Sequence, residues 1–140
     1  MKGQYLTLEY IIFFGIGLIL IISVYYAFSD INTKYEKATT EYQLRMTGEM
    51  IIGNIIRLHE ASNYTGTRIE YSLQIPERLS NCIYSVRITG NYLMLECLEG
   101  LPLGVDLTLY NFNIKIKNNI LYSTEGNIHI AAYNGRVELE

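Results

Sequence analysis

The chain has 140 residues, which is enough for one small domain and a long helix but too few for two full domains. Hydrophobic residues make up 49% of the sequence, and much of the excess over an ordinary soluble protein lies in residues 10–28. The formal net charge is −3, and the 11 lysines and arginines are spread along the chain. Because nucleic-acid binding needs a basic patch, the sequence argues against a nucleic-acid partner.

Residues 10–28 form an apolar segment of nineteen residues without a charge, and Glu9 stands directly before it. A helix of about 20 residues crosses the hydrocarbon core of a bilayer. A cleaved secretory signal and a buried core helix are the alternatives, but Ser23-Val24-Tyr25-Tyr26-Ala27-Phe28 offers no cleavage site, because bulky aromatic residues occupy positions that need small side chains. The sequence therefore predicts a retained transmembrane helix, with a carboxylate at its edge that is costly unless something uses the charge.

Residues 30–60 continue the helix as an amphipathic stem, because apolar side chains recur there at steps of three and four. From Arg68 the period changes to two, which is typical of strands. The sequence predicts an α+β fold in a lollipop arrangement: a long N-terminal hydrophobic helix and stem over residues 5–61, then an antiparallel β-sheet head over residues 62–140. Turn residues separate the candidate strands, which are 68–75, 82–89, 92–98, 105–110, 111–117, 120–124, 127–133 and 136–140.

Asn134-Gly135 is the strongest hairpin signal in the sequence, since both central residues of a type I′ turn need positive φ. A two-residue turn at this point separates an apolar face from a polar face, and this alternation supports the register. The expected pairs are Ala132 with Val137 and Ile130 with Leu139 on the apolar face, and Tyr133 with Arg136 and His129 with Glu140 on the polar face.

Cys82 and Cys97 are the two cysteines of the chain, and the hairpin between them leaves two registers open. With a turn at Thr89-Gly90, the cysteines lie directly opposite each other on an apolar face, within reach of a disulfide. With a turn at Gly90-Asn91, they are diagonal, and the bond is strained or absent. An even pair in an exported domain favours a disulfide, which would stabilise the head by about 3 kcal/mol. Two buried free thiols are the alternative.

Asn63-Tyr64-Thr65 is the only N-x-S/T sequon, and it falls in the predicted loop between stem and head, where Asn63 is a candidate glycosylation site. The sequence has no phosphate-binding glycine loop and no H-E-x-x-H motif. Two cysteines and the distant His59 and His129 do not make a metal-ligand cluster. We therefore expect no catalytic residues, no metal and no cofactor, and a protein that is not an enzyme.

The first residues carry a recognisable pattern, in which Lys2-Gly3-Gln4 precedes Thr7, Glu9 and the apolar helix. This pattern resembles the class III signal of archaeal type IV pilins, where a short basic leader runs into Q-x-S-x-E and a hydrophobic stretch. The resemblance implies that a prepilin peptidase removes the leader, residues 1–4. The family spacing from Gln to Glu is four, whereas Gln4 to Glu9 is five. Cleavage after Gly3 and cleavage after Gln4, with Tyr5 as the new N-terminus, therefore both remain open.

The resemblance also implies a role. Such proteins are structural subunits, either major or minor pilins or pseudopilins, of cell-surface filaments that serve adhesion, motility, secretion or DNA uptake. The N-terminus is cytoplasmic, and the β-rich head is extracellular and often glycosylated. In the family pattern, Glu9 pairs with the new N-terminus of a neighbouring subunit and sets the inter-subunit register. Residues 10–28 become membrane anchor and filament core, and the implied partners are other copies or related pilins, the prepilin peptidase and the assembly machinery.

A second hypothesis keeps the same layout without polymerisation. The chain is then a membrane-anchored envelope protein whose β head binds a surface-layer component or a motility-machine component. A mature protein that retains Met1-Lys2-Gly3 would favour this alternative.

Overall fold

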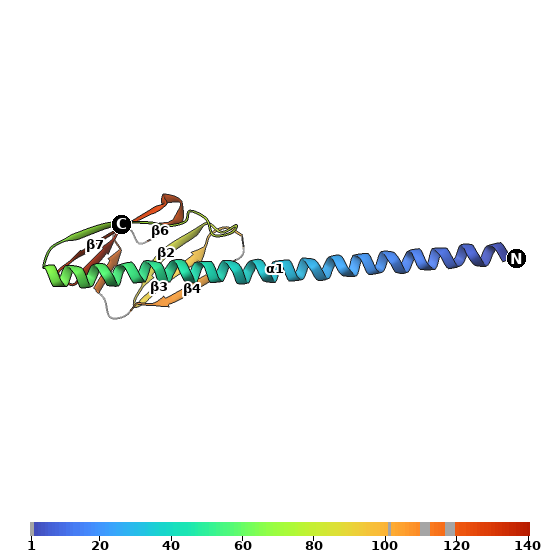
Figure 1. The fold of residues 1–140 in the computed structure, drawn as a ribbon, viewed down its shortest axis with the longest axis horizontal. Coiled ribbons are helices and arrows are strands. Elements are labelled where there is room, and N and C mark those ends of the chain that lie inside the picture. The colour runs from blue at the N-terminus through green and yellow to red at the C-terminus, as the bar shows by residue number, and fades with distance from the viewer. Residues whose placement is uncertain (1, 101, 110–112, 117–119) are drawn as a thin grey trace. The chain divides into compact units, whose positions relative to one another are not determined.

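The computed structural model describes residues 2–100, 102–109, 113–116 and 120–140. Over these residues one helix, α1 (Lys2–Thr65), precedes eight strands and a short 3-10 helix (Figure 1). A long apolar helix followed by mainly antiparallel strands confirms the α+β class. The strands are β1 (Ile69–Gln74), β2 (Tyr84–Thr89), β3 (Tyr92–Cys97), β4 (Gly104–Thr108), β5 (Asn113–Ile116), β6 (Leu121–Tyr122), β7 (Asn127–Tyr133) and β8 (Arg136–Leu139), and the 3-10 helix η1 (Ser123–Glu125) lies between β6 and β7.

The chain divides into two compact units, Met1–Glu36 and Lys37–Glu140. The division falls inside α1. The first unit therefore contains the apolar segment of the helix, and the second contains the remaining helical residues together with all the described strands.

The strands of the second unit form two four-stranded sheets, with the orders β1-β7-β8-β5 and β4-β3-β2-β6. The described strand pairs are antiparallel except β5 and β8, which run parallel. This pair departs from the expectation of a purely antiparallel head. Parallel neighbours need a long connection, and here the chain passes through β6, η1 and β7 between β5 and β8.

The last hairpin has the register expected from its turn. Asn134 and Gly135 have φ values of 48° and 73°, as a type I′ turn requires. The side chains divide between the two faces as expected, because the apolar ones are buried and Tyr133 is exposed. The observed pairs are Ala132 with Val137, Ile130 with Leu139 and Tyr133 with Arg136, and His129 and Glu140 exchange backbone hydrogen bonds of 2.7 and 2.8 Å.

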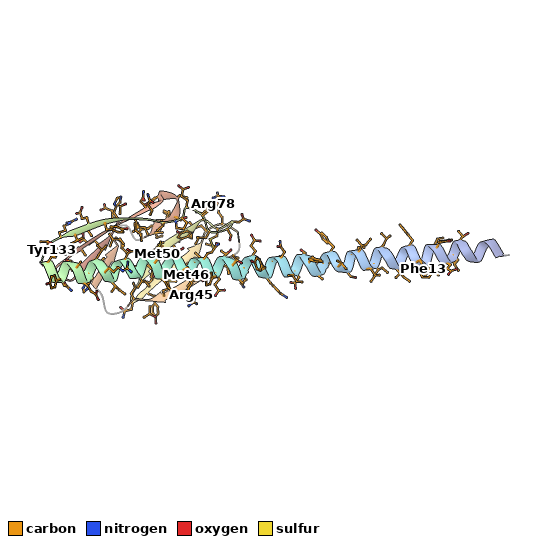
Figure 2. All side chains as sticks on the ribbon, viewed as in Figure 1. Phe13, Arg45, Met46, Met50, Arg78 and Tyr133 are labelled. Carbon is orange, nitrogen blue, oxygen red and sulfur yellow. A yellow bond between two sulfur atoms is a disulfide. The ribbon has the colours of Figure 1, made fainter. Side chains whose placement is uncertain are left out.

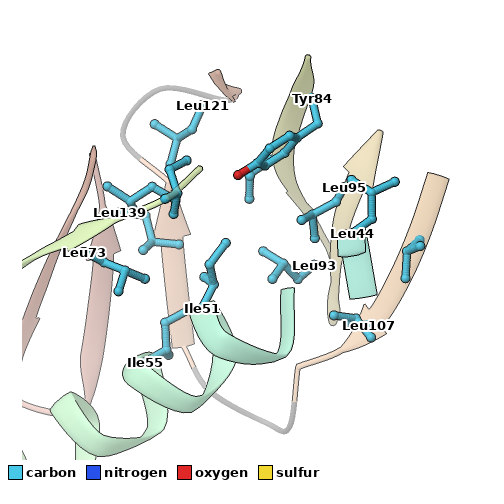
Figure 3. Packing of buried hydrophobic residues seen from close by; sticks show 14 of the residues in the cluster. Leu44, Ile51, Ile55, Leu73, Tyr84, Leu93, Leu95, Leu107, Leu121 and Leu139 are labelled. Atoms are coloured by element: carbon cyan, nitrogen blue, oxygen red, sulfur yellow. The ribbon is translucent and has the colours of Figure 1, made fainter. Parts of the chain in front are cut away.

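The core of the second unit lies between α1 and the two sheets. Leu44, Ile51 and Ile55 are completely buried, and their spacing of seven and four residues puts them on one side of the helix. Figure 3 shows these three side chains pointing toward buried leucines of both sheets. The stem predicted from the sequence thus places one row of apolar side chains against the strands.

Gly48 marks a close approach of α1 to the sheet. A Cβ atom at this position would overlap Leu107 Cδ1 and lie 3.0 Å from Leu95 Cδ1, whereas a Cβ at Gly53 would have nothing within 4 Å. Overpacking a core costs about 1–3 kcal/mol, and Gly to Ala in an open helix gains about 1 kcal/mol. We expect Gly48→Ala to lower the free energy of unfolding by about 1 kcal/mol and Gly53→Ala to raise it by a similar amount. Urea unfolding of both variants checks the opposite signs, and equal shifts would contradict the close approach.

Candidate functional site: the exposed apolar segment and Glu9

The apolar segment of α1 is open along its whole length. From Tyr10 to Phe28 every side chain is exposed, and only Gly15 and Gly17 are half-buried. Tyr10 is 70% exposed and Phe14 and Phe28 are 69% exposed. Soluble monomers rarely expose apolar patches larger than a few hundred Å². This segment therefore requires a cover that the described chain does not itself supply.

The segment is suited to a membrane. The backbone of a helix satisfies its own hydrogen bonds, which is what a lipid environment demands. Among the residues that the structure describes, α1 is the one helix that is long and apolar enough to cross a bilayer. The Ser23 hydroxyl donates a hydrogen bond of 2.8 Å to the carbonyl of Ile19, so this polar side chain is also satisfied within the helix.

Glu9 lies on α1 among apolar neighbours. Leu8, Ile12 and Phe13 line a surface hollow of about 300 Å³ together with Glu9. The Glu9 side chain is exposed, and it takes part in no ion pair within the described ranges. A carboxylate placed at the edge of an apolar segment is therefore available to a cation from another molecule.

The residues expected at the cleavage point, Gly3, Gln4 and Tyr5, belong to the first turns of α1. Their side chains lie outside what the structure describes. Processing at this point stays a prediction.

The disulfide between Cys82 and Cys97 is present, with the Cα atoms 5.5 Å apart. The hairpin nevertheless uses the turn at Gly90-Asn91, since Thr89 pairs with Tyr92 and Tyr84 pairs with Cys97. The predicted disulfide is confirmed, but it forms in the register for which a strained or absent bond was expected.

The reason is that Cys82 does not belong to β2. It ends a tight turn that begins at Leu79, and these two residues exchange backbone hydrogen bonds of 2.9 and 3.0 Å. Ser80 has a positive φ of 53° in this turn. The turn takes Cys82 out of the path of the strand, so the strand register does not fix its distance from Cys97.

Asn63 lies in the last turn of α1, not in a loop. The helix continues to Thr65, a few residues beyond the end expected from the sequence. Asn63 is exposed, and its Nδ2 atom lies 3.4 Å from the ring nitrogens of His59. The loop placement of the sequon is thereby corrected, and its glycosylation stays a prediction.

The outer face of the β1-β7-β8 sheet carries a groove that the sequence did not predict. The groove has a volume of about 360 Å³, and Glu70, Ala131 and Glu138 lie side by side across its three strands. The small Ala131 between two longer side chains leaves the space open. Arg68 Nε is 2.7 Å from Glu70 Oε1 at one side. The alternation in the sequence indicates which polar residues point outward. It does not indicate that these residues lie next to one another, because that depends on how the three strands pair.

Charged and polar side chains, among them Arg68, Glu70 and Glu138, line much of the groove. Across the described ranges, no group of three or more histidine, cysteine or carboxylate side chains gathers that could hold a metal ion. Burial raises the pKa of one tyrosine, Tyr84, but that residue is in the core and its hydroxyl donates a 2.8 Å hydrogen bond to the carbonyl of Pro76.

No protein-family model matches the chain, and neither a curated protein nor a solved structure matches it at a significant level.

Proposed function

We propose that this chain is a structural subunit of a type IV pilin-like surface filament, made as a single-pass membrane protein. The observation that carries the proposal is the fully exposed apolar segment, residues 10–28, which begins directly after Glu9. Lipid covers such a helix before assembly, and the same helices of other copies cover it afterwards. The N-terminal pattern that resembles a class III signal supports this reading over a simple anchor.

Glu9 registers one subunit against the next in this proposal. A charged side chain costs about 2.5–3.5 kcal/mol at the centre of a bilayer, so an unpaired carboxylate or ammonium at the edge of the apolar segment is also unfavourable, by a smaller amount. The new N-terminus of an adjacent subunit, exposed after cleavage at Gly3 or Gln4, offsets this cost by pairing with the carboxylate. Removal of either partner leaves the other charge unpaired, which makes the pair a strong determinant of axial position.

The remaining parts of the proposal follow from the same layout. The N-terminus is cytoplasmic, where the prepilin peptidase acts, and the strands lie outside the cell. An oxidising exterior suits the Cys82–Cys97 disulfide. Glycosylation of Asn63 is also expected outside the cell.

The test of the registration role is Glu9→Ala. We expect the number of surface filaments to fall several-fold, because the neighbouring ammonium loses its partner. Electron microscopy counts the filaments, and mass spectrometry of their subunits shows whether the leader is removed. Asp30→Ala is the matched control, since Asp30 is an exposed acid beyond the other end of the apolar segment, paired with Lys34 at 2.7 Å.

Normal filaments from Glu9→Ala would remove the registration role. A mature protein that keeps its leader and forms no filament would overturn the filament proposal itself. That outcome would favour a membrane-anchored envelope protein, and the groove on the β1-β7-β8 sheet is the specific feature that supports this second function. The groove would then hold a polar segment of a surface-layer or motility-machine component.

A further inference from the structure

Helix α1 has a second exposed apolar surface, in the part that packs on the strands. We call this surface the outer row, and it consists of Tyr42, Met46 and Met50. These residues are spaced four apart and are 63%, 50% and 38% exposed. The core row of Leu44, Ile51 and Ile55 is buried against the sheets. Figure 2 shows Met46 and Met50 as labelled side chains on this stretch of helix.

The surroundings of the outer row suit a second helix. Gly53 follows it, and a Cβ atom there would meet nothing within 4 Å, so another backbone can approach closely. Two opposite charges, Glu49 and Arg57, are exposed on the same side of α1. Neither takes part in an ion pair within the described part of the chain.

One spacing relates these features to each other. Eight residues separate Tyr42 from Met50, and eight residues also separate Glu49 from Arg57. Where two parallel helices face each other, residues on opposite flanks of the contact meet across it, as in coiled coils. A parallel copy shifted by eight residues therefore brings Tyr42 level with Met50 of its neighbour and Glu49 level with Arg57 of its neighbour.

We propose that the outer row binds the outer row of a second copy of this chain, parallel to the first and shifted along the helix by eight residues. This inference rests on the proposed filament function, which requires all copies to point the same way. The shift corresponds to an axial step of about 12 Å, given a rise of about 1.5 Å per residue. Methionine sulfur against a tyrosine ring is a favourable contact, and Glu49 with Arg57 supplies the charge complementarity that selects this step.

The contact does not hold two copies together by itself. A standard stable interface buries about 800 Å² on each partner, and three partly exposed side chains supply only a fraction of that. The outer row therefore acts together with the apolar segment, residues 10–28, and its particular contribution is the axial offset.

Cysteine crosslinking in the full-length chain tests the shift. Copies with Tyr42→Cys and copies with Met50→Cys are produced together in membranes and oxidised without a spacer. The native cysteines are already joined in a disulfide and do not compete. We expect a crosslinked dimer from the mixture and at least about fivefold less from either variant alone. Reversing one charge, with Glu49→Arg or Arg57→Glu, should lower the yield about two- to fivefold, and the double reversal should restore it.

Each outcome is decisive. No dimer from the mixture, or equal dimer from each variant alone, overturns the eight-residue shift. Filaments with normal morphology but no crosslink would refute this contact and leave the proposed function intact. A crosslink in a chain that never forms filaments would refute the filament proposal and keep the paired helices.

Discussion

Replacing both cysteines by serine, Cys82→Ser with Cys97→Ser, should lower the free energy of unfolding of the second unit by about 3 kcal/mol. The bond closes a loop with a sequence separation of 15, and the chain-entropy estimate for a loop of that size is about 3 kcal/mol. Urea unfolding of the full-length protein in detergent, followed by the near-ultraviolet signal of its tyrosines, measures the change.

The structure adds a local readout to this prediction. The disulfide fastens the turn from Leu79 to Cys82 to the end of β3, and the Ser80 hydroxyl in that turn donates a 3.0 Å hydrogen bond to Gln43 of α1. Loss of the bond should therefore raise hydrogen exchange at the turn before it does so in β7. Reduction of the wild-type protein is the matched control, since it removes the bond without a substitution. Unchanged stability in both cases would show that the turn is held by its own hydrogen bonds.

Much of the fold was predictable from local patterns. Alternation of apolar and polar residues located the strands, and the observed bounds differ from the expected ones by a few residues. The Asn134-Gly135 turn predicted its hairpin register because both of its central residues favour positive φ. Burial of the apolar face allowed no slip of a single residue.

In the β2–β3 hairpin, the local signal that selects the register is the position of the glycine in the turn. Thr89-Gly90-Asn91 contains one glycine and two possible two-residue turns. Gly90 has a φ of 60°, and type II′ turns place glycine first, so the glycine position favours Gly90-Asn91. The parallel pairing of β5 with β8 was not predictable, because it joins segments whose own alternation says nothing about their neighbours.

The candidate site divides in the same way. Glu9 and residues 10–28 are contiguous in sequence, so composition alone identified them. The outer row of α1 could not be predicted, because apolar residues at steps of three and four do not indicate which side of the helix the strands cover. The groove around Ala131 could not be predicted either, because its residues come together only through the register of three strands and form no contiguous sequence motif.

Two buried serines should respond in opposite ways to alanine. The Ser123 hydroxyl donates a 2.7 Å hydrogen bond to the carbonyl of Glu77 and accepts one of 3.1 Å from the backbone N–H of Tyr84. The side chain is fully buried. The Ser85 hydroxyl is also buried, but it has no hydrogen-bond partner in the part of the chain that the structure describes.

We expect Ser123→Ala to lower the free energy of unfolding by about 2–4 kcal/mol, because it leaves the buried N–H of Tyr84 unpaired, at about 1–3 kcal/mol, and removes the hydrogen bond to the Glu77 carbonyl, at about 1 kcal/mol. Ser85→Ala removes a hydroxyl that gains nothing from burial, so its unfolding free energy should stay the same or rise by up to about 1 kcal/mol. Both variants remove one hydroxyl oxygen from a buried serine. The loss of side-chain volume is therefore the same in both, and a difference between them reflects the hydrogen bonds. Urea unfolding of the two proteins under the same conditions compares them directly. Equal losses would mean that packing, and not the hydrogen bonds of Ser123, connects Glu77 to β2.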